Sequence, residues 1–151
     1  MGIEESVNFR EVGPHLTTSG AVTAEQLGTL VDHGYDAVVD LLPGRHDQAV
    51  PGEAAIVEGQ GLGYVHIPVD FAAPTRHDLE AFVAAMDALE GRKVHVHCAA
   101  NWRVTAFYGL YAERKGLWTE AESDAFIHAT WDPADHEAWA SFIEEERASR
   151  P

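Results

Sequence analysis

The stretch Lys93-Val-His-Val-His97-Cys98-Ala-Ala-Asn-Trp-Arg103-Val-Thr105 joins an apolar, alternating segment to a helix through a short loop. Residues 93–97 are typical of a buried β-strand, and the helix is expected to begin near Arg103. In an open parallel sheet, ligands bind beyond the carboxyl ends of the strands, where loop N–H groups and a helix N-terminus attract anions. The stretch therefore predicts an α/β sheet with an anion-binding loop at its edge.

Cys98 is the only cysteine in the chain, so it cannot form an internal disulfide. The helix N-terminus, the guanidinium of Arg103 and the loop amides would each stabilise a thiolate here, with His97 holding the loop from behind. Arg103 can also clamp two oxygen atoms of one anion. These residues predict a cysteine nucleophile, and the alternative is a buried, inert cysteine at an ordinary strand end.

Strand-like and helix-like segments alternate along the rest of the chain. Residues 37–42 and 64–69 have the composition of short buried strands. Helix starts are marked by capping threonines and by one Asp-Pro pair, at Thr23, Thr75, Thr119 and Asp132. Strands separated by helices imply βαβ crossovers. The sequence therefore predicts one α/β domain over residues 1–151, with a central, mainly parallel β-sheet flanked by helices and a helical C-terminal third.

Composition narrows the classes of partner. The 151 residues carry a formal net charge of −15 with only two lysines, which argues against nucleic acid or an anionic membrane as the main partner. No apolar run approaches the length of a membrane span, and the first residues lack the basic and apolar character of a signal peptide. We expect a cytoplasmic protein, in which an anionic substrate would depend on local positive charge such as Arg103.

The order His, Cys, short loop, Arg, then Ser or Thr on a helix resembles the signature of cysteine-dependent phosphatases of the protein-tyrosine and dual-specificity type. Other motifs extend the likeness to small bacterial phosphatase-like proteins of that superfamily: Asn8-Phe-Arg10, Thr18-Ser-Gly20, Thr23-Ala-Glu-Gln-Leu27 and Ile67-Pro-Val69. The resemblance implies a phosphatase-like fold and the hydrolysis of a phosphomonoester on a phosphorylated protein or a small molecule. It implies no cofactor and no metal.

The resemblance also implies roles for individual residues. Cys98 would attack phosphorus to form a phosphocysteine, which a water molecule would then hydrolyse. Asp70, on the loop after the preceding strand, matches the acid that protonates the leaving oxygen, while Asp78 is a weaker candidate because helix capping explains it. Thr105 could donate a hydrogen bond to the sulfur. Arg103 would hold the phosphate oxygens with the help of the surrounding loop: His97, Ala99, Ala100, Asn101 and Trp102.

The loop departs from the superfamily pattern in its length. Five residues usually separate the cysteine and the arginine, whereas four intervene here and the usual glycine is absent. Either the loop is one residue shorter and Arg103 keeps its role, or the loop keeps its length, Val104 replaces the arginine and Thr105 stays in register. Because one residue turns a helical side chain by about 100°, the two alignments predict different sites.

Three other interpretations stay open at this point. The span from Cys98 to Arg103 resembles the tighter cradle of rhodanese-like sulfurtransferases, which holds a cysteine persulfide. A catalytically silent relative that binds phosphate or a phosphopeptide would keep the loop but would not need Asp70. A metal site could form from histidines on one face of neighbouring strands, although no carboxylate or second cysteine falls at supporting spacing: His66, His95 and His97.

Overall fold

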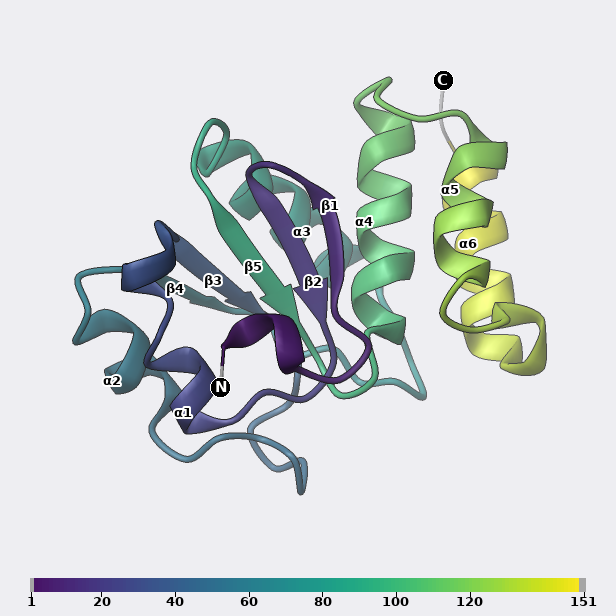
Figure 1. Ribbon diagram of the computed structural model, residues 1–151. Coiled ribbons are helices and arrows are strands. Elements are labelled where there is room, and N and C mark those ends of the chain that lie inside the picture. The colour runs from purple at the N-terminus through teal and green to yellow at the C-terminus, as the bar shows by residue number, and fades with distance from the viewer. Residues whose placement is uncertain (1, 150–151) are drawn as a thin grey trace.

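The computed structural model describes residues 2–149 of the chain. Its centre is a sheet with the strand order β1-β2-β5-β3-β4 (Figure 1). Strand β1 pairs with β2 in antiparallel fashion, and the remaining neighbours are parallel. The strand bounds are β1 Arg10–Gly13, β2 Leu16–Ser19, β3 Ala37–Asp40, β4 Gly63–His66 and β5 Val94–His97.

Helices connect the parallel strands and form the C-terminal part of the described chain. None of them combines the length and the apolar character that crossing a bilayer requires. The α-helices are α1 Ala24–Leu27, α2 Glu53–Glu58, α3 Arg76–Ala88, α4 Trp102–Arg114, α5 Glu120–His128 and α6 Glu137–Ala148. Short 3-10 helices are η1 Ile3–Glu5, η2 Val31–His33 and η3 Pro133–Asp135.

The predicted fold class is confirmed: the chain forms a mainly parallel sheet flanked by helices, with a helical C-terminal part. The capping boxes at Thr23 and Thr119 are present, because each threonine accepts from the N–H three residues on. The strands expected at 37–42 and 64–69 end earlier, at Asp40 and His66, although Val69 still donates its N–H to the Leu41 carbonyl.

The hairpin of β1 and β2 is absent from the sequence-based prediction. Its second strand carries three consecutive hydroxyl side chains, Thr17, Thr18 and Ser19, which lack the apolar alternation typical of a strand. All three side chains are buried, and each has a hydrogen-bond partner in the sheet or the Cys98 loop. Long-range partners therefore decide the conformation of this segment.

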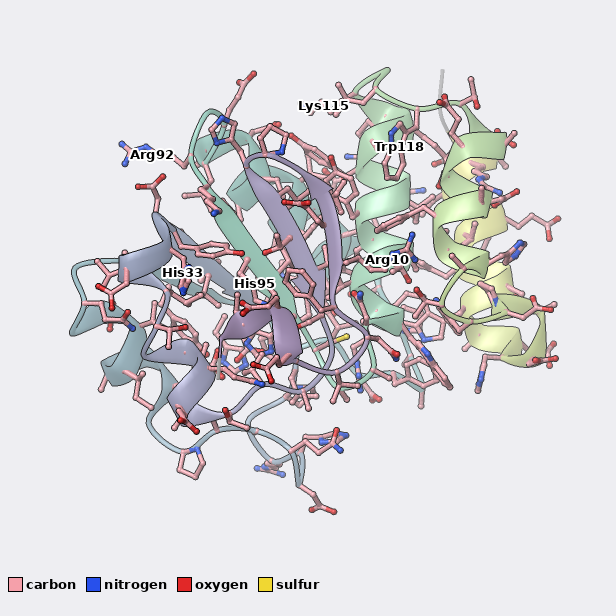
Figure 2. All side chains as sticks on the ribbon, in the orientation of Figure 1. Arg10, His33, Arg92, His95, Lys115 and Trp118 are labelled. Carbon is pink, nitrogen blue, oxygen red and sulfur yellow. The ribbon has the colours of Figure 1, made fainter. Side chains whose placement is uncertain are left out.

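Alternate strand residues face two different cores. On one face, Val39 and Val96 pack with α3 and α4, and α5 and α6 lie beyond α4 (Figure 1). On the other face, Val38 packs with residues of η1, α1 and α2. His95 lies in β5 on this second face, where its ring contacts Tyr35 (Figure 2). The same alternation directs the residues that follow the strand ends.

Candidate active site

Cys98 directly follows the last residue of β5, at the edge where the parallel strands end. Alternation places His97 on the face of α2 and Cys98 on the face of α3 and α4, where Cys98 joins the apolar core. Its N–H donates to the Ser19 carbonyl at 3.2 Å, which fixes the start of the loop against β2. The side chain has no exposed surface in this conformation.

The loop after Cys98 turns its carbonyl groups outward. The Ala99 carbonyl accepts from the N–H of Ala21 at 2.8 Å, and the Ala100 carbonyl accepts from Nδ2 of Asn8 at 2.9 Å. In a trans peptide the next N–H points the opposite way, so the N–H groups of Ala100 and Asn101 point inward. Within residues 2–149, no backbone carbonyl accepts from either group. The loop therefore presents free N–H donors, as an anion-binding nest requires.

Asn101 closes the loop and begins α4. Its φ is 67°, a left-handed conformation that asparagine tolerates better than most residues. Its buried amide donates to the Asn8 carbonyl at 2.9 Å and to Thr18 Oγ1 at 3.0 Å. Gly20 lies against the same loop: a Cβ at this position would approach the Ala99 carbonyl oxygen to 2.4 Å. The N-terminal hairpin thus fixes the conformation of the loop.

Arg103 lies on the first turn of α4 and its side chain is buried. Nε donates to the Val69 carbonyl at 2.9 Å, and the guanidinium carbon lies 5.2 Å from the centre of the Phe71 ring. In the described part of the chain, its two terminal nitrogens have no hydrogen-bond partner, so both remain available to an anion. Val104 is fully buried in the core, which favours the alignment in which Arg103 keeps the arginine's role.

Asp70 directly follows Val69, so the hydrogen bond from Arg103 brings the two predicted site residues to the same loop. Asp70 is exposed, and its Oδ1 accepts from the N–H of Ala72 at 3.0 Å. Asp78 lies on the first turn of α3, where its N–H donates to the capping hydroxyl of Thr75 at 3.1 Å. Asp70, and not Asp78, therefore lies on the segment that Arg103 contacts.

Aromatic rings hold the other side of the loop. The indoles of Trp102 and Trp131 stack, with centroids 5.2 Å apart and planes at 3°. Phe71 contacts both indoles, and its carbonyl accepts from Nε1 of Trp139 at 2.7 Å. Thr105 is engaged here as well, because its hydroxyl donates to the Trp102 carbonyl at 3.1 Å and accepts from Trp131 Nε1 at 3.0 Å. Its proton is therefore directed to a carbonyl and not to the sulfur.

His97 lies behind the loop between two buried carboxylates. Nε2 is 2.5 Å from Glu53 Oε2 and 3.6 Å from Asp40 Oδ1. Burial lowers the pKa of His97, but the hydrogen bond to Glu53 and the charges of Asp40 and Glu53 outweigh it and raise that pKa above its ordinary value. Neither carboxylate was identified from the sequence as part of the site, because Asp40 ends a strand that reads as apolar and Glu53 lies on a short separate helix.

The three histidines considered as metal ligands do not converge on one ion. His95 is held between Thr17 and Ser19, at 2.7 and 2.8 Å, and burial lowers its pKa well below the ordinary value. His66 Nε2 donates to the Leu42 carbonyl at 2.7 Å. The expectation that no carboxylate supports a metal site is wrong in one respect, since Asp40, Glu53 and His97 place ligand atoms within 4.8 Å of one another.

The spacing of this carboxylate–histidine cluster nevertheless fits a proton better than an ion. Two ligands of one tetrahedral zinc lie roughly 3.3 Å apart when each bond is about 2.0 Å. The 2.5 Å between His97 and Glu53 is shorter than that and corresponds to a charge-assisted hydrogen bond. The two carboxylates therefore hold the His97 imidazole in place.

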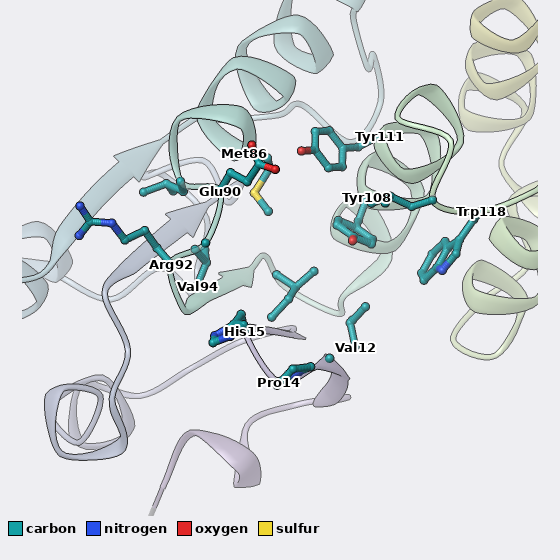
Figure 3. Close-up of a pocket in the computed structure, with 15 residues that line it drawn as sticks. Val12, Pro14, His15, Met86, Glu90, Arg92, Val94, Tyr108, Tyr111 and Trp118 are labelled. Carbon is teal, nitrogen blue, oxygen red and sulfur yellow. The ribbon is translucent and has the colours of Figure 1, made fainter.

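A second hollow lies at the opposite edge of the sheet, where β2 and β5 begin (Figure 3). It has a volume of about 560 Å³ and is lined mainly by apolar side chains, among them Met86, Tyr108 and Trp118. No residue of the Cys98–Arg103 loop lines this hollow. The loop at the carboxyl edge, and not this apolar hollow, collects the thiol, the arginine and the free N–H groups.

Comparisons with known proteins agree with this geometry. A family model described as "DSP-PTPase phosphatase fused to NAD+ Kinase" matches residues 4–126. The beta-lactamase hydrolase-like protein of Xylella fastidiosa strain Temecula1 is 29% identical over 122 residues, which cover 79% of this chain. The match spans only 28% of the length of that curated relative.

Solved structures share the fold closely. A candidate phosphatase (DUF442) from Shewanella putrefaciens CN-32 is 34% identical, covers 97% of this chain and 92% of its own, and superposes with a TM-score of 0.86. TpbA of P. aeruginosa superposes with a TM-score of 0.72 over 92% of this chain and 84% of its own, at 17% identity. At that identity the likeness to TpbA shows the fold alone. A cysteine-to-serine variant of TpbA has been solved in complex with pTyr.

Proposed function

We propose that the chain hydrolyses a phosphomonoester through a phosphocysteine on Cys98, because it belongs to the dual-specificity and protein-tyrosine phosphatase family described as fused to NAD+ kinase. Arg103 and the inward N–H groups of the loop would hold the phosphate oxygens. The family favours phosphate over the persulfide of the sulfurtransferase alternative. The substrate would be a phosphorylated protein or a phosphorylated small molecule.

Two steps with balanced bonds make up the proposed reaction. In the first, Sγ of Cys98 forms a bond to phosphorus while the bond from phosphorus to the leaving oxygen breaks, and Asp70 donates its proton to that oxygen. In the second, water attacks phosphorus, the sulfur leaves as a thiolate and Asp70 takes up the proton of the water. Inorganic phosphate is released, and the enzyme returns to its starting state.

The observation that carries the proposal is the orientation of the loop peptides. The carbonyl groups of Ala99 and Ala100 are bound by Ala21 and Asn8, so the N–H groups that follow them point away from that hairpin and stay free. Hydrogen-bond donors held in advance stabilise the charge of a transferring phosphoryl group without reorganisation. This arrangement supports a site for a trigonal or tetrahedral oxyanion beside the sulfur, despite the shorter spacing between Cys98 and Arg103.

Turnover by the wild type and by Cys98→Ser is the primary test. The wild type should hydrolyse an aryl phosphate and phosphotyrosine peptides between about pH 5 and 8, where a thiolate and a carboxylic acid can coexist. The Cys98→Ser protein should show no turnover while it still binds the substrate. Equal residual activity in both proteins would remove Cys98 from the role of nucleophile.

The role of Arg103 is tested by measuring the binding of vanadate, which resembles the phosphoryl group in the transition state of its transfer. Arg103→Ala should lose most of the affinity for vanadate, because one bidentate charge-assisted contact disappears. Arg45→Ala removes an exposed arginine after β3 and serves as the matched control. Unchanged vanadate affinity in Arg103→Ala would show that the other alignment of the loop is correct.

The role of Asp70 as the acid is tested with substrates whose leaving groups differ in their need for protonation. Asp70→Asn should slow an alkyl phosphate far more than a nitrophenyl phosphate, since a good leaving group departs without protonation. Asp78→Asn is the control, because this second carboxylate lies on α3. Equal losses on both substrates in Asp70→Asn would assign Asp70 a structural role only.

A second function is favoured by one specific observation: the side chain of Cys98 has no exposed surface. A loop that keeps its N–H groups and Arg103 over a shielded thiol suits an oxyanion-binding relative without turnover. Vanadate or phosphotyrosine binding by a wild-type protein that hydrolyses neither substrate would support this function. Thiosulfate would then be the next substrate, to test sulfur transfer.

A further inference from the structure

His95 of β5 lies in a row of buried polar side chains on the second face of the sheet (Figure 2). Its Nδ1 is 2.7 Å from Thr17 Oγ1, which is itself 2.8 Å from the hydroxyl oxygen of Tyr35. Its Nε2 is 2.8 Å from Ser19 Oγ, which donates to the Gly20 carbonyl at 2.9 Å. Four hydrogen bonds therefore connect Tyr35 to the backbone that follows β2.

The direction of each bond in this row follows from the groups that can only accept. A carbonyl cannot donate, so the proton of Ser19 is directed to Gly20, and Nε2 of His95 carries the proton that Ser19 accepts. Burial lowers the pKa of His95 well below its ordinary value, so the ring is neutral and Nδ1 accepts from Thr17. Thr17 in turn accepts from Tyr35, whose phenol keeps its proton because burial raises its pKa. Every bond therefore points from Tyr35 toward Gly20.

The opposite direction leaves a buried group without a partner. If Nδ1 of His95 carried the proton, Ser19 would have to donate to Nε2 and would have no proton left for Gly20. Gly20 is buried, and no other group that the structure describes donates to its carbonyl. Leaving a buried carbonyl unpaired is costly. The hydrogen-bond pattern therefore selects the Nε2–H tautomer of His95.

The series of bonds continues through two peptide groups into the Cys98 loop. The Gly20 carbonyl and the Ala21 N–H belong to one peptide, and that N–H donates to the Ala99 carbonyl at 2.8 Å. The Ala99 carbonyl shares its peptide with the Ala100 N–H, which is one of the free donors of the loop. Carbonyl and N–H point in opposite directions in a trans peptide, so each peptide passes the direction on. Because hydrogen bonds arranged head to tail polarise one another, the Ala100 N–H is the positive end of the whole series.

We propose that neutral His95 is a positioning residue for the oxyanion site. It acts through Ser19 and the Gly20–Ala21 peptide, which orient and polarise the Ala100 N–H toward a bound oxyanion. His95 touches neither the thiol nor the anion, and its charge does not change. The inference deepens the proposed function and rests on it in one respect, since the loop must bind an oxyanion. It concerns anion binding and not turnover, so the two can fail separately.

The tautomer of His95 is measured in the wild type by ¹⁵N NMR of the histidine rings at about pH 7. The ring resonances are assigned through the side-chain carbons, so no variant is needed. Nε2 should carry the proton, and Nδ1 should have the chemical shift of an acceptor. A proton on Nδ1, or on both ring nitrogens, would overturn the inference whatever the behaviour of any variant.

The coupling between His95 and the anion is measured by titrating the same protein with inorganic phosphate, with saturation followed at the Ala100 amide. Binding should strengthen every bond behind the Ala100 N–H, so the Nε2 resonance of His95 should shift as the site fills. In Ser19→Ala this response should vanish, because the bond to Gly20 is missing. His33, an exposed histidine of η2, is the reference and should not respond. Saturation with no shift at His95 would overturn the inference and leave the proposed function standing.

The affinity for phosphate should fall in a graded series of variants. Ser19→Ala should weaken binding about 2- to 10-fold, the range expected for one buried hydrogen bond. Thr17→Val breaks the series farther from the anion and should have a smaller effect, and Tyr35→Phe should have the smallest. Ser6→Ala is the matched control, since it removes a buried hydroxyl that donates to the Ile3 carbonyl outside the series. Its affinity should not change.

The outcomes separate the inference from the proposed function. Equal phosphate affinity in folded Ser19→Ala and Ser6→Ala proteins would overturn the inference even if Cys98 proves to be the nucleophile. A response at His95, together with the graded loss of affinity, in a protein that hydrolyses no phosphomonoester would support the inference and reject the proposed function.

Discussion

The two flanks of the Cys98–Arg103 loop are held by different forces. On the polar flank, formed by Asn8, Thr18 and residues 19–21, hydrogen bonds hold the Cys98 N–H, the Ala99 and Ala100 carbonyls and the Asn101 side chain. On the aromatic flank, rings and two indole N–H groups hold the end of the loop and the segment that carries Asp70: Phe71, Trp102, Trp131, His136 and Trp139.

The difference separates two tasks. Hydrogen bonds are directional, so the polar flank determines which way each peptide of the loop points. Ring contacts depend on area and tolerate small rotations, so the aromatic flank fixes distances between segments and leaves Arg103 free at its terminal nitrogens. The polar flank thus controls the orientation of the loop N–H groups, and the aromatic flank controls the position of the segment that carries Asp70. Substitutions on the polar flank should therefore affect anion binding most, and those on the aromatic flank should affect the acid step most.

The largest expected effect comes from Gly20→Ala on the polar flank. The new Cβ would lie 2.4 Å from the Ala99 carbonyl oxygen and 2.7 Å from Ala100 Cα, so the loop backbone must move. A misplacement of about 1 Å can cost about 100-fold in rate, and we expect at least that loss in kcat/KM and in vanadate affinity. Gly13→Ala, with nothing within 4 Å of its Cβ, is the control. Full vanadate affinity in Gly20→Ala would contradict the assigned loop conformation.

On the aromatic flank, Trp139→Phe keeps a ring but removes the donor to the Phe71 carbonyl. The unpaired carbonyl should cost about 1–3 kcal/mol of unfolding free energy, measured by urea denaturation. Turnover of alkyl phosphates should fall about 10-fold, with a smaller loss on nitrophenyl phosphate, if the acid loop shifts. Trp118→Phe, at a ring that contacts Tyr108 and Phe126, is the control. Equal slowing of both substrates would separate Phe71 from the acid step.

The two histidines of β5 differ in charge within one strand, because burial keeps His95 neutral whereas Glu53 and Asp40 keep His97 charged. The lowered pKa of His95 means that stability is lost as the pH falls below the unfolded value of 6.5. The raised pKa of His97 means that its contribution is complete below 6.5 and is lost as the pH rises through the folded pKa. The free energy of unfolding should therefore peak near 6.5, with slopes up to about 1.4 kcal/mol per pH unit.

Urea unfolding between about pH 5 and 9 checks this profile. Glu53→Gln should remove the decline above the maximum and leave the decline below it, since only His97 depends on that carboxylate. A profile that rises steadily through pH 8 in the wild type would show that His97 is not charged in the native state.

The smallest effect is expected for Asn8→Gly. Glycine accepts the φ of 50° at this position without strain, so the variant isolates the loss of the hydrogen bond to the Ala100 carbonyl. Because Asn8 is exposed, this should cost only about 0.5–1.5 kcal/mol of vanadate binding energy or of stability. A loss as large as that of Gly20→Ala would indicate that Asn8 alone orients the loop.

Local signals explain which parts of the fold could be predicted. Thr23 and Thr119 cap helices through residues only three positions away, and the strand of Val94–His97 is followed at once by its loop and helix. The hairpin of β1 and β2 was missed because Thr17 and Ser19 are stabilised in a strand by His95, more than 70 residues later. No pattern within a short window can reveal such a partner.

The residues of the site also divide into those that local sequence signals predict and those that only distant contacts reveal. Cys98, Arg103 and Asp70 were named from the signature and the strand order, and the structure places Arg103 beside the segment of Asp70. Glu53 was missed because its meaning depends on packing against His97, which lies 44 positions away. Trp131 and Trp139, on the C-terminal side of α4, donate to Thr105 and Phe71, and their role in supporting the site depends on these distant partners.

The stacked indoles of Trp102 and Trp131 give the protein an optical reporter of its own loop. Two chromophores with centroids 5.2 Å apart in nearly parallel planes couple their electronic transitions, and the coupling falls steeply as they separate. One indole belongs to the Cys98–Arg103 loop, and the other lies beyond the segment that the family model matches. Circular dichroism and tryptophan emission should therefore register, without any label, the arrival of an anion or a displacement of the C-terminal helices.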